Sequence, residues 1–245
     1  MIPNDPLPAT DQQPRIASGP FWTYSDLLLF ILLAIPSLGL AFLAAMLLTA
    51  VTTLSAPFRL VFAQVLWYAL AFGCLKMLLL FRYQRPFWRS LGWASLPFFS
   101  TTACLFAGPV LALALGLLGT VMHTPEIPLP FQQMLKDAPT TVLLGLLVVV
   151  FGPLCEELAF RGFLMPLLVR SLGAAAGIVI TGILFGCSHG YEYEWSWRHM
   201  ILISGAGCAF GWAKYRTGST AAAAFMHSTF NLMQFAAFLM QARTI

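Results

Sequence analysis

The feature that most limits the fold of this chain is a series of about seven long apolar stretches. A helix needs about 20 mostly apolar residues to cross a bilayer core, where every backbone polar group must find its partner inside the protein. The sequence therefore predicts an all-α, polytopic transmembrane helical bundle of about seven to eight spans. The stretches run over residues 24–52, 58–81, 97–122, 140–170, 173–189, 198–215 and 220–241.

Composition agrees with a lipid environment and excludes several other classes of protein. Charged residues make up 9% of the chain, whereas soluble domains contain roughly 25%. The five cysteines lie singly within apolar runs, so neither a disulfide framework nor a zinc knuckle is expected. The net charge of +4 is small and scattered, which argues against a nucleic-acid partner. The partner that the composition predicts is the lipid bilayer.

The pattern predicts one domain with a short tail. Residues 1–20 are polar and rich in proline, so we expect a disordered tail, followed by a single transmembrane domain over residues 21–245. Counting alternate loops places most basic residues on one side of the membrane and most loop acids on the other. Because basic loops face the cytoplasm, the amino terminus is expected there. The short length and the lack of a soluble appendage lead us to expect a bacterial plasma membrane. The basic group is Arg82, Arg85, Arg89, Arg170, Lys214 and Arg216, and the acidic group is Glu126, Asp137, Glu192 and Glu194.

The loop at residues 190–197 is both acidic and aromatic. Tyrosine and tryptophan gather at membrane interfaces, so the first interpretation is an interfacial anchor. A lid or a substrate contact is the alternative.

Six polar residues inside three apolar spans are the candidates for chemistry. Ionisable groups cost roughly 2.5 to 3.5 kcal/mol at the centre of a spanning helix, so such residues usually serve a function. Asp26 and Lys76 need none, because they lie near helix ends where a dipole or the interface accommodates them. The remaining set predicts a shared polar cavity within the membrane. Its members are Glu156, Glu157 and Arg161 in the fourth span, His189 at the end of the fifth, and His227 and Asn231 in the seventh.

Helical spacing relates these residues to one another. Glu157 and Arg161 are four apart and can pair, whereas Glu156 lies about 100° further around the helix. His227 and Asn231 are also four apart and share a face. Pro153 lacks a backbone donor and is therefore expected to end or kink the fourth helix. Glycines in the fifth and sixth spans would allow close approach: Gly177, Gly182, Gly186, Gly205, Gly207 and Gly211.

The set fits hydrolysis of a peptide bond, so a membrane-associated peptide or protein substrate is the expected further partner. A carboxylate beside an imidazole can deprotonate water, roles that suit Glu156 and His189. An imidazole and an amide can stabilise an oxyanion, which suits His227 and Asn231. On this scheme no cofactor is required. The alternative is zinc held by Glu156, His189 and His227, and a non-proteolytic binding or immunity module could use the same cavity. Cys155 and Ser188 adjoin motif residues but point elsewhere on their helices.

These motifs resemble those of the CPBP family, which joins type II CAAX prenyl endopeptidases to bacterial Abi and bacteriocin-processing or self-immunity proteins. Glu156, Glu157 and Arg161 match its EExxxR motif, Phe185 and His189 match FxxxH, and His227 and Asn231 match HxxxN. The similar part covers about residues 140–241. The resemblance implies an intramembrane endopeptidase in which Glu156 and His189 activate water, His227 and Asn231 stabilise the oxyanion, and Arg161 holds Glu157. The family is commonly labelled a metalloprotease, although a metal-free mechanism is supported for its CAAX branch.

Overall fold

The computed structural model describes residues 19–53, 55–127, 135 and 137–242. The predicted disordered tail therefore lies outside the described residues, apart from Gly19 and Pro20. Within the described ranges the fold is all-helical, as the apolar pattern predicted. The helices are α1 (Tyr24–Val51), α2 (Ala56–Tyr83), α3 (Phe87–Ser90), α4 (Phe98–Val121), α5 (Ala138–Leu146), η2 (Leu147–Phe151), α6 (Gly152–Glu157), η3 (Leu158–Leu164), α7 (Met165–Leu172), α8 (Ala174–Ser188), α9 (Trp197–Thr217) and α10 (Thr220–Ala242).

Each predicted span corresponds to one helix or to one run of helical segments, within a few residues at the ends. Among the residues that the structure describes, four elements are long and apolar enough to cross a membrane: α1, α2, α4 and the run at residues 138–172. Helix α8 is apolar but has only 15 residues. At about 1.5 Å per residue it is about 22 Å long, less than the roughly 30 Å of a bilayer core. If its first residue lies at one edge of the bilayer core, its last residue, beside His189, lies inside the membrane.

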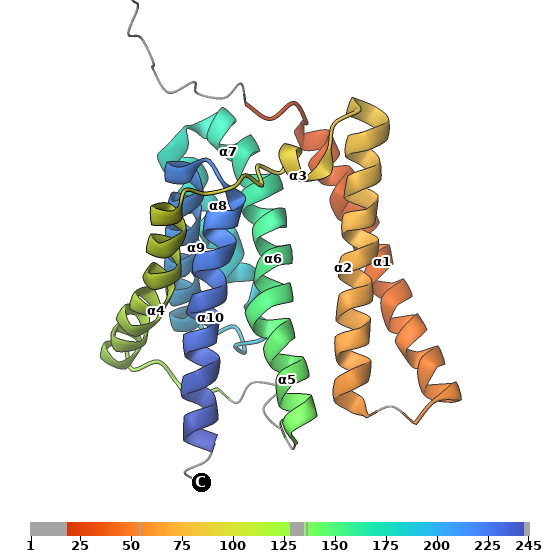
Figure 1. The fold of residues 1–245 in the computed structure, drawn as a ribbon, viewed down its shortest axis with the longest axis vertical. Helices are drawn as coiled ribbons and strands as arrows, with labels where there is room; N and C mark the ends of the chain where they lie inside the picture. Colours follow the sequence, from red (N-terminus) through yellow and green to blue (C-terminus); the bar gives the residue numbers. More distant parts are fainter. Residues whose placement is uncertain (1–18, 54, 128–134, 136, 243–245) are drawn as a thin grey trace, which may run out of the picture.

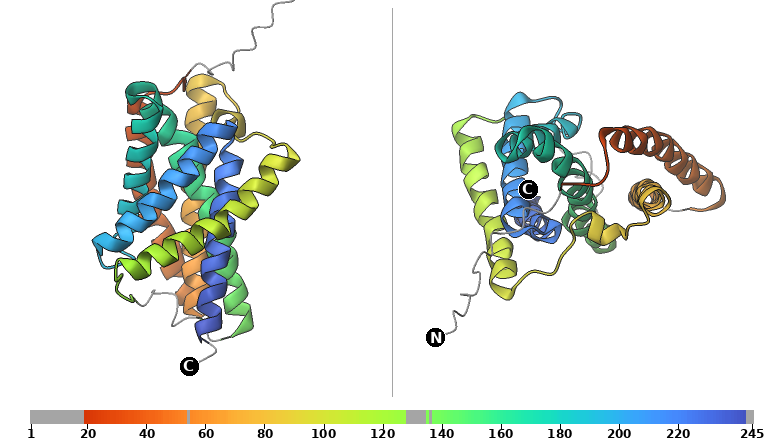
Figure 2. Two further views of the ribbon diagram at one scale, coloured as in Figure 1. Left: turned by 90° about the vertical axis from the view of Figure 1, so that its left-hand side faces the viewer. Right: turned by 90° about the horizontal axis from the view of Figure 1, so that it is seen from above.

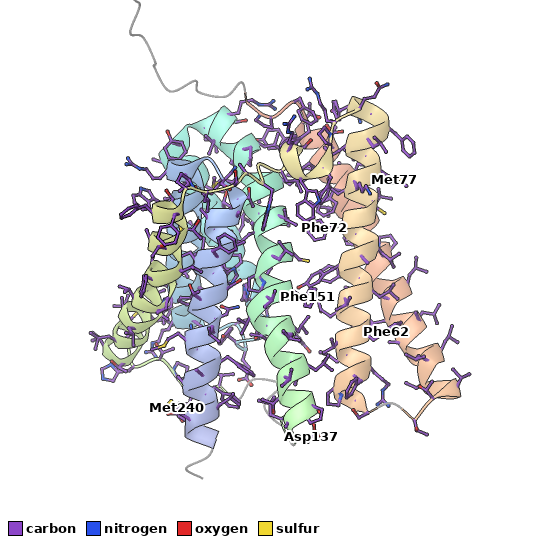
Figure 3. The ribbon with its side chains drawn as sticks, viewed as in Figure 1. Phe62, Phe72, Met77, Asp137, Phe151 and Met240 are labelled. Carbon is purple, nitrogen blue, oxygen red and sulfur yellow. The ribbon has the colours of Figure 1, made fainter. Side chains whose placement is uncertain are left out.

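Successive long helices alternate in direction, so the first and last described residues lie at opposite ends of the bundle (Figure 1). The basic residues of the predicted cytoplasmic side gather at the end where the described chain begins. There Arg170 donates to the carbonyl of Pro20 at 2.6 Å, and Lys214 donates to the carbonyl of Gly218 at 3.0 Å. At the opposite end Arg198 donates to the carbonyl of His123, and Asp137 caps the N-terminus of α5 (Figure 3). The loops that the sequence placed together on one side of the membrane therefore lie together at one end of the bundle.

The main core lies where α4, α8, α9 and α10 meet. Phe185, Phe210 and Phe230 are buried there among alanines of α9 and α10. Gly182 and Gly207 let α8 and α9 approach each other closely, because a Cβ atom on Gly207 would lie 3.0 Å from the Gly182 Cα. Gly182 and Gly207 thus act as predicted. Gly205 is exposed instead, and a Cβ there would meet only Leu115 of α4, at 3.8 Å.

Helices α1 and α2 form a hairpin beside this bundle rather than within it (Figure 1; Figure 2, right). Near its upper end the hairpin joins the bundle through Trp22, whose indole donates to the Phe163 carbonyl at 3.0 Å and stacks on that ring. Near its lower end Val61 packs on Leu144 and Leu147 of the 138–172 run. The middle of α2 lies between these two contacts.

The helical run at residues 138–172 passes through two π-helical segments, η2 and η3, which flank α6. A π-helix pairs each carbonyl with the amide five residues later and is often found at functional sites. The amide of Gly152 accordingly donates to Leu147, and that of Met165 donates to Phe160. Pro153 therefore does not end the helix. The chain continues through it because the register has changed just before the proline.

Candidate active site

The predicted site residues come together where α6 and η3 face α8, α9 and α10. Glu157 and Arg161 form an ion pair with 2.8 Å between Arg161 Nη1 and Glu157 Oε1, and both side chains are fully buried. Arg161 also donates from Nη2 to the Gly207 carbonyl at 2.8 Å, and its guanidinium lies 4.4 Å from the centre of the Phe185 ring. The predicted pairing is therefore present, and Phe185 of the FxxxH motif covers the cation.

Glu157 has a second partner that helical spacing did not reveal. Its Oε1 atom lies 2.9 Å from Nδ1 of His227, 70 residues further along the chain. The His227 ring stacks on Phe210, with 4.5 Å between centroids. Since a carboxylate only accepts, Nδ1 carries the proton of this hydrogen bond. Arg161, Glu157 and His227 thus form one continuous polar chain in an otherwise apolar core.

Glu156 occupies the open end of this chain. Its Oε2 atom lies 3.9 Å from Nε2 of His227, and its side chain remains 28% exposed. No hydrogen bond holds its carboxylate among the described residues. The two adjacent glutamates therefore differ. Glu157 is buried and accepts hydrogen bonds from both Arg161 and His227, whereas the Glu156 side chain is partly exposed.

His189 caps the end of α8 and contacts the same aromatic ring as His227. The Phe185 ring lies 4.7 Å from the His189 ring and 5.5 Å from the His227 ring, centre to centre. Nδ1 of His189 donates to the Phe185 carbonyl at 2.8 Å. A carbonyl accepts only, so this bond places the proton on Nδ1 and leaves Nε2 as the acceptor in the neutral ring.

Asn231 lies one turn beyond His227 on α10, as predicted. Its Nδ2 atom donates to the backbone carbonyl of Val148, in the η2 segment, at 2.8 Å. An amide nitrogen has two hydrogens. One is used by Val148, and the other remains for a second acceptor.

Two further polar groups approach the site without having been predicted from their sequence positions. Tyr68, in the middle of α2, is close enough to Glu156 and Glu192 to interact with their charges, and it hydrogen-bonds Gln64. Glu192, in the loop after His189, interacts electrostatically with both His189 and Glu156. Burial raises the pKa of Glu192, attraction to His189 opposes that shift, and repulsion from Glu156 adds to it.

The loop that carries Glu192 has two different faces. Its backbone is folded on itself through a 2.7 Å bond from the Trp195 amide to the Gly190 carbonyl. Tyr191 and Trp195 are exposed, whereas Glu192 is partly buried. The exposed aromatic face suits the interfacial anchor, and the inward Glu192 suits the alternative of a substrate contact. The hydrophobic pattern gives no signal for such a residue in so short a loop.

A zinc site requires three protein ligands arranged around one point. Within the described residues no group of three or more histidine, cysteine, aspartate or glutamate side chains has that arrangement. Glu156, His189 and His227 therefore do not form such a group in the described part of the chain.

Comparisons with known proteins support one family. Residues 138–233 match the model described as type II CAAX prenyl endopeptidase Rce1-like. This matched segment contains all three motifs and runs from the start of α5 into α10. No curated protein and no solved structure matches the chain. The motif residues, their order and the matched segment thus agree: residues 138–233 are similar to the Rce1-like type II CAAX prenyl endopeptidase family, a family of peptidases.

Proposed function

We propose that this protein is an intramembrane endopeptidase that hydrolyses a peptide bond of a membrane-associated, CAAX-like substrate. The observation that carries the proposal is the polar chain Arg161–Glu157–His227, which ends at the partly exposed Glu156. A chain of this kind is costly in an apolar core unless the charge it orients is used.

Glu156 is the general base in this scheme. It takes a proton from water as the water oxygen bonds to the scissile carbonyl carbon, and it returns the proton to the amide nitrogen as the C–N bond breaks. His189 assists by accepting a hydrogen bond from the same water at Nε2. Its Nδ1 bond to Phe185 favours the tautomer in which Nε2 is free to accept.

His227 and Asn231 are the proposed oxyanion donors. Because Nδ1 of His227 already donates to Glu157, donation from Nε2 requires the imidazolium form. Such an ion balances the set, since two cations, His227 and Arg161, then face two anions, Glu156 and Glu157. Asn231 donates through the N–H that Val148 leaves unused.

The favoured scheme is metal-free, because it assigns a task to every motif residue. Metal analysis of active protein tests this point. Stoichiometric zinc, with activity lost on chelation and regained with zinc alone, would overturn it.

The amino-terminal end of the bundle is proposed to face the cytoplasm, because basic side chains cluster there. A reporter fused after Arg89 should then be cytoplasmic, and one fused near Glu192 should be external. Two reporters on the same side of the membrane would show that the alternation of helices in Figure 1 does not describe the protein in its bilayer.

The decisive test of hydrolysis uses full-length protein in detergent with a prenylated CAAX peptide and its unprenylated twin, read by mass spectrometry. Glu156→Gln should abolish cleavage while sparing the fold, because the amide keeps the shape and loses the base. Glu194→Gln is the matched control, since Glu194 is an exposed loop acid. Cleavage that continues unchanged in Glu156→Gln would remove this residue from the mechanism. Equal cleavage of both peptides would remove the prenyl group from the proposed substrate.

A further inference from the structure

The proline of α6 lies where the π-helical register needs an amide. In η2 the amide of Gly152 donates to Leu147, five residues earlier. The next carbonyl is that of Val148, and the residue five positions later is Pro153. Proline has no backbone N–H. The Val148 carbonyl therefore lacks the donor that the register would supply.

A side chain from α10 takes the place of that missing amide. Asn231 Nδ2 donates to the Val148 carbonyl at 2.8 Å, across 83 residues of sequence. A carbonyl can only accept, so the bond fixes which end of the side-chain amide faces η2. It also fixes the plane of the amide, and with it the direction of the second N–H.

We propose that Pro153 is a positioning residue, which keeps the Val148 carbonyl free so that this carbonyl orients the Asn231 amide toward the reacting carbonyl. The consequence for turnover rests on the proposed function. The orientation of the Asn231 amide does not depend on the proposed function, and it can be measured in inactive protein.

The second π-helix supplies a matched control within the same chain. Met165 donates to Phe160 across η3, so the next carbonyl, that of Arg161, would need the amide of residue 166. Residue 166 is also a proline. Among the hydrogen bonds of the described residues, no side chain donates to the Arg161 carbonyl. Pro166 thus repeats the backbone arrangement without an asparagine to orient.

The kinetic test is a double-mutant cycle of Pro153→Ala and Asn231→Ala. Alanine restores a backbone N–H that competes for Val148 and is favourable in a helix. Pro153→Ala should lower kcat about tenfold with KM nearly unchanged, whereas Asn231→Ala should lower kcat by on the order of a hundredfold. In the Pro153→Ala background, Asn231→Ala should cost much less than in the wild type. Pro166→Ala should match the wild type. If the kcat losses of the two single variants simply multiply in the double variant, the two residues act independently and the proposal is overturned.

The structural test uses the fact that Asn4 and Asn231 are the only asparagines in the chain. Selective ¹⁵N-asparagine labelling of the inactive Glu156→Gln protein gives two side-chain amide signals, and Asn231→Ala assigns them. The Asn231 signal should shift with Pro153→Ala and remain in place with Pro166→Ala. An unchanged Asn231 signal in Pro153→Ala would overturn the proposal even if the enzyme proves active. A shift in a protein that cleaves nothing would preserve the orientation and reject the proposed function.

Discussion

Two arginine–carboxylate pairs lie in different regions of this molecule and have similar geometry. In the hairpin, Arg82 and Asp26 are 3.0 Å apart, and the Arg82 side chain is 54% exposed. In the motif region, Arg161 and Glu157 are 2.8 Å apart, and neither side chain is exposed. The surroundings therefore distinguish an ion pair that ties two helix ends together from one that is buried among the motif residues.

The partners of the two carboxylates reinforce this contrast. Asp26 also accepts from the Tyr83 hydroxyl at 2.6 Å and from the Thr23 amide at 2.8 Å, all near one end of the hairpin. Glu157 instead accepts from His227, on a distant helix. Without Arg82, the buried Asp26 carboxylate keeps two local donors, Tyr83 and Thr23. Without Arg161, the buried Glu157 carboxylate keeps only its hydrogen bond to His227.

The largest effect is expected from Arg161→Ala. Removing one partner of a buried pair costs about 3 to 5 kcal/mol, because the buried Glu157 carboxylate loses its arginine and keeps only the hydrogen bond to His227. The yield of folded protein should fall strongly, as measured by size-exclusion chromatography and thermal unfolding in detergent. Glu156→Gln should keep the wild-type yield. Equal losses in the two variants would mean that both glutamates are structural.

Arg82→Ala should have a much smaller effect. Arg82 is half-exposed although Asp26 is buried, ion pairs at the surface contribute roughly 0 to 1 kcal/mol, and Asp26 keeps its bonds to Tyr83 and Thr23. Thermal unfolding should shift by only a few degrees, and less still at high salt, where exposed charges are screened. A loss of stability as large as that of Arg161→Ala would show that the hairpin pair contributes as much to folding as the buried pair. The comparison between the two regions would then fail.

Glu192→Gln should have the smallest effect and the opposite sign. Because burial raises the pKa of Glu192 in the folded state, the fold binds its proton more tightly than the unfolded chain does. This carboxyl group therefore lowers stability as pH rises from the unfolded pKa toward the folded one. Glu192→Gln should unfold at a slightly higher temperature than the wild type at pH 7 and at a similar temperature near pH 4.

Glu194→Gln, two residues away and exposed, controls for removal of a loop charge. A stability gain of the same size in both variants would assign the effect to net charge rather than to burial of Glu192.

The sequence alone determined the features that depend on local pattern. Apolar length predicted the helices, because each spanning helix pairs its own backbone groups without help from neighbours. Helical spacing predicted the Glu157–Arg161 pair, which lies within one turn of one helix. Three motifs in order indicated the family.

Only the tertiary structure decided the contacts between helices distant in sequence. The hydrogen bond from His227 to Glu157 and the one from Asn231 to Val148 join residues that are 70 and 83 positions apart in the sequence. Spacing within a helix carries no information about the rotation of that helix against another. The sequence did not predict the π-helical segments either. A change from four to five residues between donor and acceptor leaves the apolar pattern almost unaltered. That small change, together with one missing amide at Pro153, is what places Asn231.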